Sequence, residues 1–195
     1  MISAILVANV SRTKTRYVWS VFLAILVAGL IPGCGRPAKT PVMPTEPTPA
    51  PPDALGRVIH FDASREAQPY QVSGWSGTEE HLTWTVGKAA VLAFPVPPNA
   101  GALSLRMYFA AYTHSPEIPY QPVEFYANGQ RVAEWQAGSP GHFTAVIPKE
   151  VLDRTNTLVL ELRTPRAASP GAFTAKGDPR TLGISCFELE LTKAP

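Results

Sequence analysis

The sequence predicts an all-β fold: an antiparallel β-sandwich, specifically a jelly roll, after an N-terminal signal helix and a disordered proline-rich linker. Three observations predict it. Residues 57–191 contain eight or nine short segments that are apolar or alternate apolar with polar side chains. Turn-forming residues separate them roughly every ten residues, with almost no helical periodicity. The first and last segments are both apolar, which favours a jelly roll among sandwiches.

The first 33 residues are typical of a secretory signal peptide. An apolar run of fifteen residues, 17–31, follows three basic residues, Arg12, Lys14 and Arg16. A membrane-spanning helix needs roughly 20 apolar residues, so a signal peptide is the better interpretation. An uncleaved anchor helix is the alternative. Residues 31–34, Ile-Pro-Gly-Cys, resemble the processing site of bacterial lipoproteins, although Pro32 replaces the usual Ala, Ser or Thr.

The resemblance implies that Cys34 is the lipidated N-terminus of the mature chain, carrying acyl chains such as palmitate. Membrane lipid is then a partner, and the bacterial cell envelope is the expected location. Gly35, rather than Asp, follows the cysteine, which resembles outer-membrane sorting in cells with two membranes. If lipidation uses Cys34, Cys186 is the one cysteine left, so no intramolecular disulfide can form.

The expected domains are the signal peptide (1–33), the lipidated cysteine with its linker (34–54) and the β-sandwich (55–195). Seven of the seventeen residues in 36–52 are proline. Such a run favours polyproline II at about 3.1 Å per residue, a stalk of roughly 50 Å. Without the three basic residues of the signal, the 17 basic residues fall to 14, against 15 acidic ones. This balance gives no support to nucleic-acid binding.

The strands follow from local patterns. Residues 102–112 and 157–163 alternate with period two, whereas the continuous apolar run at 89–96 predicts a strand buried on both faces. Asn128-Gly129 is the strongest hairpin signal in the chain. The expected strands are 57–61, 89–96, 102–112, 123–126, 131–136, 142–147, 157–163 and 182–191.

Two departures from simple strands are also expected. Residues 148–152 begin with proline and predict one helical turn. In the last strand the apolar positions change parity between Cys186 and Phe187, which predicts a β-bulge or a change of face.

Two motifs resemble a known family. One is Gly-Trp-Ser-Gly-Thr-Glu at 74–79, followed by Trp84 and Gly87, and the other is Asp-Pro-Arg-Thr-Leu-Gly-Ile at 178–184. Together they resemble an uncharacterised β-sandwich domain appended to bacterial membrane glycosyltransferases and phosphoglycerol transferases, over residues 57–192. The resemblance implies a carbohydrate-binding-like jelly roll in envelope glycan biology. Thr83 and His81 depart from the arginine and the aromatic residue usual in that family.

The candidate ligand-binding residues are aromatic and charged side chains near these motifs: Trp75, Glu79, Trp84, Asp178 and Arg180. Aromatic faces stack on sugar C–H surfaces, while carboxylates and guanidinium groups hold hydroxyls. Structural interpretations compete with this one. Trp84 alternates with Leu82 and Val86, as a core residue would. Glu79 and Arg180 could pair with each other and fix the loop at 165–180.

The sequence predicts no enzyme, no cofactor and no metal site. It holds no nucleophile elbow, and its four histidines lack metal-ligand spacing. The expected function is therefore a lipid-anchored, non-catalytic, carbohydrate-binding-like domain with an envelope glycan as ligand. The first alternative is an interaction module that docks on an envelope glycosyltransferase and binds no sugar. The second is a hydrolase without a recognisable motif.

Overall fold

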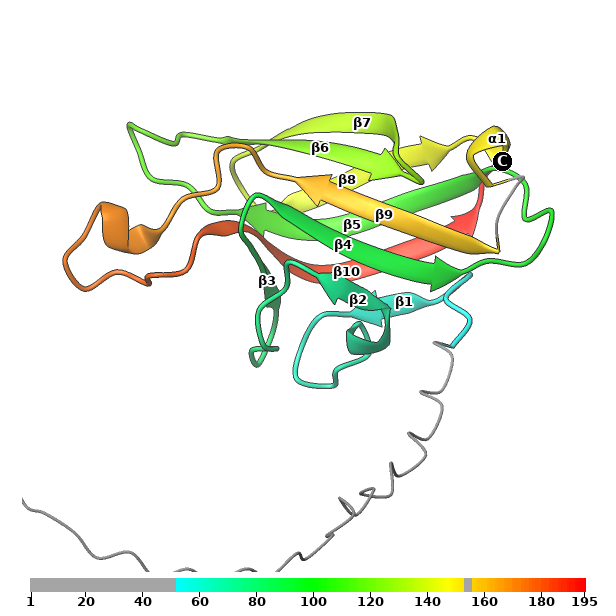
Figure 1. Cartoon of the computed structure of the whole chain (residues 1–195), viewed down its shortest axis with the longest axis horizontal. Coiled ribbons are helices and arrows are strands. Elements are labelled where there is room, and N and C mark those ends of the chain that lie inside the picture. The colour runs from blue at the N-terminus through cyan, green and yellow to red at the C-terminus, as the bar shows by residue number, and fades with distance from the viewer. Residues whose placement is uncertain (1–51, 153–155) are drawn as a thin grey trace, which may run out of the picture. The chain divides into compact units, whose positions relative to one another are not determined.

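The computed structural model of the protein describes residues 52–152 and 156–195. The expected signal peptide (1–33), the expected lipidation site Cys34 and the expected linker up to Pro51 lie outside the described residues. The described residues form two antiparallel sheets packed face to face, and this confirms the predicted all-β sandwich (Figure 1). None of the helices among them is long and apolar enough to cross a membrane.

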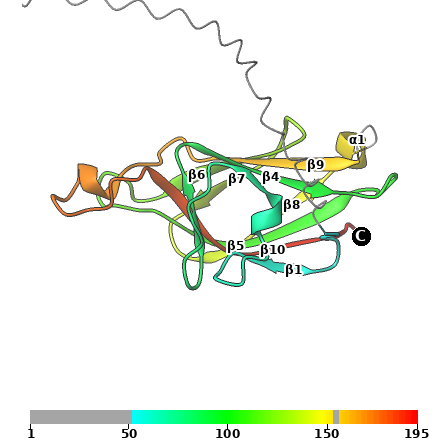
Figure 2. The ribbon, with the colours of Figure 1, turned by 60° about the horizontal axis from the view of Figure 1, so that its bottom comes forward.

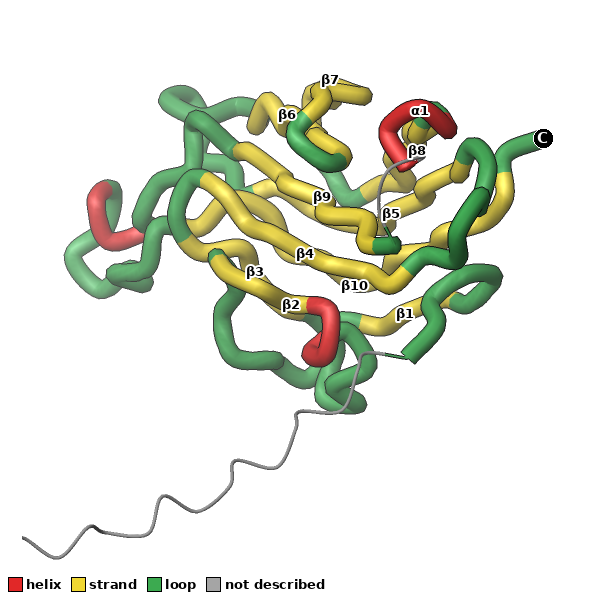
Figure 3. The backbone as a smooth tube through the Cα atoms, turned by 45° about the vertical axis from the view of Figure 1, so that its right-hand side comes forward, coloured by secondary structure: helices red, strands yellow, loops and turns green. Residues whose placement is uncertain are grey.

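Each sheet has five strands, and the two lie as separate layers in Figure 2. Sheet A contains β1 (Val58–His60), β3 (Thr83–Val86), β5 (Leu103–Ala111), β8 (Gly141–Ile147) and β10 (Leu182–Lys193). Sheet B contains β2 (Gln71–Ser73), β4 (Ala89–Pro95), β6 (Gln121–Ala127), β7 (Gln130–Ala137) and β9 (Thr157–Arg163). Figure 3 shows β2, β4 and β9 side by side.

The chain changes sheet at almost every connection. Only the β6–β7 hairpin joins two strands of the same sheet consecutively among the described strands. The order is β1-β10-β5-β8 in sheet A, where β3 also pairs with β10, and β2-β4-β9-β6-β7 in sheet B. Strands far apart in sequence therefore become neighbours, as a jelly roll requires. Residues 52–152 and 156–195 contain three short helices, η1 (Gln68–Tyr70), α1 (Lys149–Leu152) and η2 (Pro170–Ala172).

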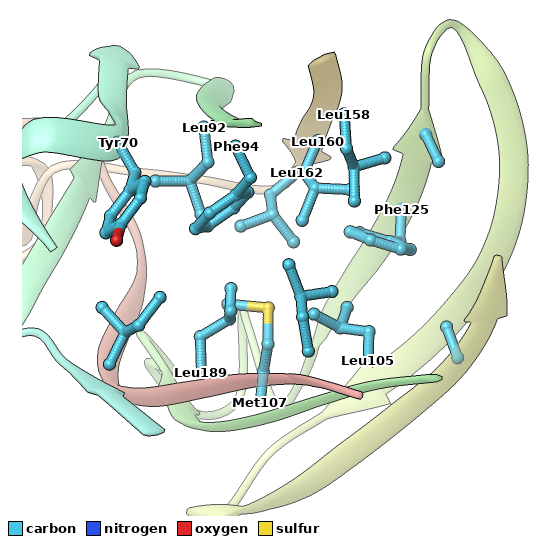
Figure 4. Close-up of a cluster of buried hydrophobic side chains, with 14 of the residues drawn as sticks. Tyr70, Leu92, Phe94, Leu105, Met107, Phe125, Leu158, Leu160, Leu162 and Leu189 are labelled. Carbon is cyan, nitrogen blue, oxygen red and sulfur yellow. The ribbon is translucent and has the colours of Figure 1, made fainter. Parts of the chain in front are cut away.

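The core lies between the two layers. Alternation in β5 sends Leu103, Leu105, Met107 and Phe109 inward, all fully buried, and β9 contributes Leu158, Leu160 and Leu162. In Figure 4, Leu92, Phe94 and the β9 leucines point from sheet B toward Leu105, Met107 and Leu189 of sheet A. Burial of this apolar area is the main favourable contribution to folding, at about 25 cal/mol per Å².

All eight expected strands are confirmed; the ends of 157–163 match, and the other strands have at least one end shifted by one or two residues. The helical turn expected at 148–152 is confirmed as α1. Asn128 and Gly129 both have positive φ, 45° and 81°, as a two-residue hairpin turn of the primed type requires. The expected bulge lies where the β10–β5 register shifts, between Cys186 and Glu188. The prediction that 89–96 is buried on both faces is wrong, because Val91 and Ala93 on the outer side are only half-buried.

Residues 71–86 contain β2 and β3, which the sequence did not predict. The chain leaves sheet B at Ser73 and pairs with β3 in sheet A from Gly74 onward. Gly74 has φ +76°, and a Cβ there would lie 2.7 Å from the Ala90 Cα and closer still to the Ala89 carbonyl oxygen. Only glycine lets the backbone cross between the sheets this tightly. We call residues 74–76 the crossing segment.

Candidate functional site

The structure brings three of the predicted site residues together. The Arg180 guanidinium contacts both carboxylate oxygens of Asp178, with Nη2 at 2.6 Å from Oδ2, and lies 3.4 Å from Glu79 Oε1. Hydrogen bonds from Arg180 lower the pKa of Asp178 below its ordinary value. The structure thus contains the ion pair between Glu79 and Arg180 that the sequence offered as a structural role for these two residues. This triad joins the long β9–β10 loop to the β2–β3 loop.

Trp75 belongs to the inner face. It pairs with Thr85, whose side chain is buried, and paired residues point to the same side of a sheet. Its ring packs on Phe61 with centroids 5.2 Å apart, and its Nε1–H donates to the Val91 carbonyl at 2.9 Å. The indole therefore already has its hydrogen-bond partner and fills the seam between the sheets.

Trp84 points the other way. Its neighbours Thr83 and Thr85 are 0% and 1% exposed, so β3 turns its threonines inward and Trp84 outward. The core alternation expected for Leu82, Trp84 and Val86 is wrong. The threonines can be inside because Thr83 Oγ1 donates to the Phe61 carbonyl and Thr85 Oγ1 accepts from the Ile184 amide. The two tryptophans thus lie on opposite faces and do not converge.

A second group of candidate side chains gathers on the outer face of sheet A. Strand register places His60, Glu188, Tyr108 and His142 in one row across β1, β10, β5 and β8. The next row, two residues along each strand, holds Val58, Glu190, Arg106 and Thr144. We call the titratable and aromatic members of this face the sheet A platform: His60, Arg106, Tyr108, His142, Phe187, Glu188 and Glu190.

The aromatic part of the platform is a run of three rings. Tyr108 lies between His142 and Phe187, with ring centroids 4.8 and 5.0 Å away. Phe187 is the extra residue of the β10 bulge, between the pairs Cys186–Phe109 and Glu188–Tyr108. Because bulges re-aim side chains, this one places the Phe187 ring beside Tyr108 on the outer face.

The polar part of the platform surrounds these rings. Arg106 Nε–H donates to His142 Nδ1 at 3.2 Å, and His60 Nδ1 lies 3.8 Å from Glu188 Oε1. Glu190 has no ion-pair or hydrogen-bond partner within the part of the chain that the structure describes. A shallow depression of about 40 Å³ lies here, lined by Val58, Arg106, Tyr108, His142, Glu188, Leu189 and Glu190.

Two carboxyl groups and one thiol among the described residues have displaced pKa values. Within residues 52–152 and 156–195, the two carboxyl groups with a displaced pKa, Asp62 and Asp178, are both shifted downward by hydrogen bonds. A general acid at neutral pH needs the opposite shift. Burial raises the pKa of the Cys186 thiol, which suppresses its reactivity. The same residues contain no group of three or more His, Cys, Asp and Glu able to hold a metal ion.

The sheet A platform was not predicted from the sequence. Arg106 and Tyr108 were visible as the outward members of an alternating strand, and Glu188 and Glu190 alternate likewise in the last strand. Their convergence depends on β10 lying between β1 and β5, a long-range pairing that no local pattern specifies.

No protein-family model and no curated protein sequence matches this chain. Similar solved structures include β-sandwich carbohydrate-binding modules. The CBM36-1 domain of a multidomain xylanase from the hindgut metagenome of Trinervitermes trinervoides is 9% identical, with a TM-score of 0.44 over 71% of this chain and 98% of that one. A CBM36 module in complex with calcium and xylotriose has 9% identity and a TM-score of 0.41, over 69% and 98%.

A third similar structure is the CBM22-1 xylan-binding domain from Paenibacillus barcinonensis, with 13% identity and a TM-score of 0.43 over 74% of this chain and 99% of that one. Similarities this weak carry no argument about ligand or activity. The fold assignment rests on the strand pairing described above, and the function must be argued from the side chains of this chain.

Proposed function

We propose that the protein is a non-catalytic carbohydrate-binding protein of the bacterial cell envelope, and that its β-sandwich binds glycan on the sheet A platform. The observation that carries the proposal is the run of three rings, His142, Tyr108 and Phe187, beside two carboxylates and a guanidinium group. Sugars present apolar C–H faces and a rim of hydroxyl groups. A platform of rings flanked by charged hydrogen-bonding groups complements both.

The dimensions fit a short oligosaccharide. The platform crosses four strands, so at a spacing of about 4.8 Å it is roughly 14 Å wide. Its two rows lie two residues apart along each strand, or about 7 Å. A chain of sugars lying across the strands would place its rings on the aromatic row and its hydroxyl groups toward Arg106 and Glu190.

The test is a screen of the full-length chain, kept in a detergent that contains no sugar, against bacterial envelope glycans, followed by calorimetric titration of the best ligand. An aromatic contact contributes about 0.5–1.5 kcal/mol beyond the burial of apolar area, so its loss in Tyr108→Ala should raise Kd about 2- to 12-fold. Tyr126→Ala is the matched control, because Tyr126 lies on sheet B, bonded to Glu124 and stacked under Arg163. Equal losses in both variants, or no bound glycan, would contradict the proposal.

The proposal includes a lipid anchor at Cys34. It is supported by the basic start, the short apolar run and the Ile-Pro-Gly-Cys sequence at 31–34. Acyl chains there would hold the domain at the membrane, at the outer membrane in cells that have two. Labelled palmitate should enter the wild type and Cys186→Ala but not Cys34→Ala. Label in Cys34→Ala would instead indicate an acylation site elsewhere.

A further inference from the structure

The central strand of the platform carries two carboxylates with little to neutralise them. Glu188 and Glu190 lie on the same face of β10, two residues apart, between β1 and β5. Among the described residues, Glu188 has one ionisable partner, His60, whose Nδ1 lies 3.8 Å from Glu188 Oε1. Glu190 stands opposite Arg106 in the strand register, yet Arg106 makes no ion pair with it within the described residues.

The hydrogen bond between Arg106 and His142 explains this imbalance. Arg106 Nε can only donate, so His142 Nδ1 must accept, and an imidazole that accepts at Nδ1 is neutral. Arg106 Nε–H is thus directed toward His142 on β8 and not toward Glu190 on β10. The titratable groups that line the depression are two carboxylates, Glu188 and Glu190, the Arg106 guanidinium, the Tyr108 hydroxyl group and the His142 imidazole. The imidazole of His60, on β1, lies beside Glu188.

We propose, on the basis of the proposed function, that this face selects glycans bearing free amino groups and disfavours anionic ones, with Glu190 as the specificity-determining residue. A sugar ring on Tyr108 brings its substituents above the second row, where the Glu190 carboxylate accepts from an ammonium group. A uronate at the same place meets Glu188 and Glu190 and gains only Arg106, whose Nε–H is already donated to His142. A neutral, N-acetylated sugar keeps the ring contact without the charge attraction.

The experiment uses three probes of equal length, tetramers of glucosamine, of N-acetylglucosamine and of galacturonic acid, titrated into the full-length protein at neutral pH. We expect the glucosamine tetramer to bind most tightly and the galacturonic acid tetramer most weakly. An exposed charge pair contributes about 0.2–1 kcal/mol, so Glu190→Gln should weaken glucosamine binding about 1.5- to 5-fold and leave N-acetylglucosamine binding unchanged. Added salt should reduce the same preference, because exposed charges are screened within about 10 Å at 0.1 M.

The matched control is Glu124→Gln, which removes a carboxylate from the outer face of sheet B. Equal effects of Glu190→Gln and Glu124→Gln would overturn the inference, as would tightest binding of galacturonic acid. Equal binding of all three tetramers, lost in Tyr108→Ala, would overturn the charge selection and leave glycan binding standing. No binding of the tetramers overturns the inference, and no binding across the whole glycan screen overturns the proposed function itself.

Discussion

Replacing Gly74 with alanine tests how the crossing segment holds the two sheets together. Two costs combine at this position. An L-residue at φ +76° costs about 1–2 kcal/mol relative to glycine. The new Cβ would also meet backbone atoms, with the Ala90 Cα at 2.7 Å and the Ala89 carbonyl nearer still. Backbone cannot yield as a side-chain tip can, and overpacking of this kind costs about 1–3 kcal/mol.

The free energy of unfolding should therefore fall by about 2–5 kcal/mol, a large share of the roughly 5–15 kcal/mol of a typical domain. Gly87→Ala separates the two costs. Gly87 has φ +86° but nothing within 4 Å of its Cβ position, so only the backbone cost applies. Gly77→Ala, at a position with open space and no unusual φ, should change stability by less than about 1 kcal/mol.

The assay is urea and thermal unfolding of the full-length chain and the three variants, followed by near-ultraviolet circular dichroism. Each kcal/mol lowers Tm by roughly 3 °C in a domain of this size. Gly74→Ala should therefore unfold roughly 3–9 °C below Gly87→Ala. Equal midpoints for these two variants would refute the reasoning, because they would show that the chain crosses between the sheets without close backbone contact at Ala89 and Ala90.

Three further predictions follow from the described contacts. Phe125 is fully buried and stacked on Trp135, with ring centroids 5.4 Å apart, so Phe125→Ala should lower the free energy of unfolding by about 3–5 kcal/mol. Urea unfolding would measure this, and a loss under about 1 kcal/mol would contradict the place of Phe125 in the core. Because Arg180 lowers the pKa of Asp178, this carboxylate contributes stability above the unfolded value of 3.8 and loses it as the pH falls through the folded value; Asp178→Asn should flatten the acid side of the stability profile, and an unchanged profile would contradict the triad. Cys186, buried with a raised pKa, should resist thiol reagents until the domain unfolds, as peptide mass spectrometry of the labelled protein would show; rapid labelling of native protein would contradict its burial.

The elements predicted best from the sequence are those whose pattern is local. The alternation at 102–112 fixed both the strand and its inward side chains, because one residue of slip would expose every core residue. The Asn128-Gly129 turn was equally clear, since few residues adopt two successive positive φ values. The bulge after Cys186 was visible as a change of parity in the apolar positions.

The parts that the sequence did not predict depend on hydrogen bonds and on distant partners. Thr83 and Thr85 look like surface residues until their hydroxyls are seen bonding to buried backbone groups. These hydrogen bonds allow both threonines of β3 to face the core, so that Trp84 between them faces outward. Trp75 lies inside because Gly74 redirects the chain, a long-range backbone constraint with no periodic signal.

One part of the candidate site could likewise be predicted from the sequence, and another part could not. The pairing of Glu79 with Arg180 could be proposed from their charges, although 101 residues separate them. The sheet A platform could not, because Tyr108, His142 and Glu188 become neighbours only through the strand order β8-β5-β10.

The most direct test of the central claim is backbone amide chemical-shift mapping of the isotopically labelled protein during titration with the tightest glycan from the screen. Glycan binding on the platform predicts saturable shifts clustered on β5, β8 and β10, around Tyr108, His142 and Glu190. Shifts clustered instead on the loop at 165–181 and the loop between β2 and β3 would contradict this location, and the absence of any saturable shift would contradict carbohydrate binding.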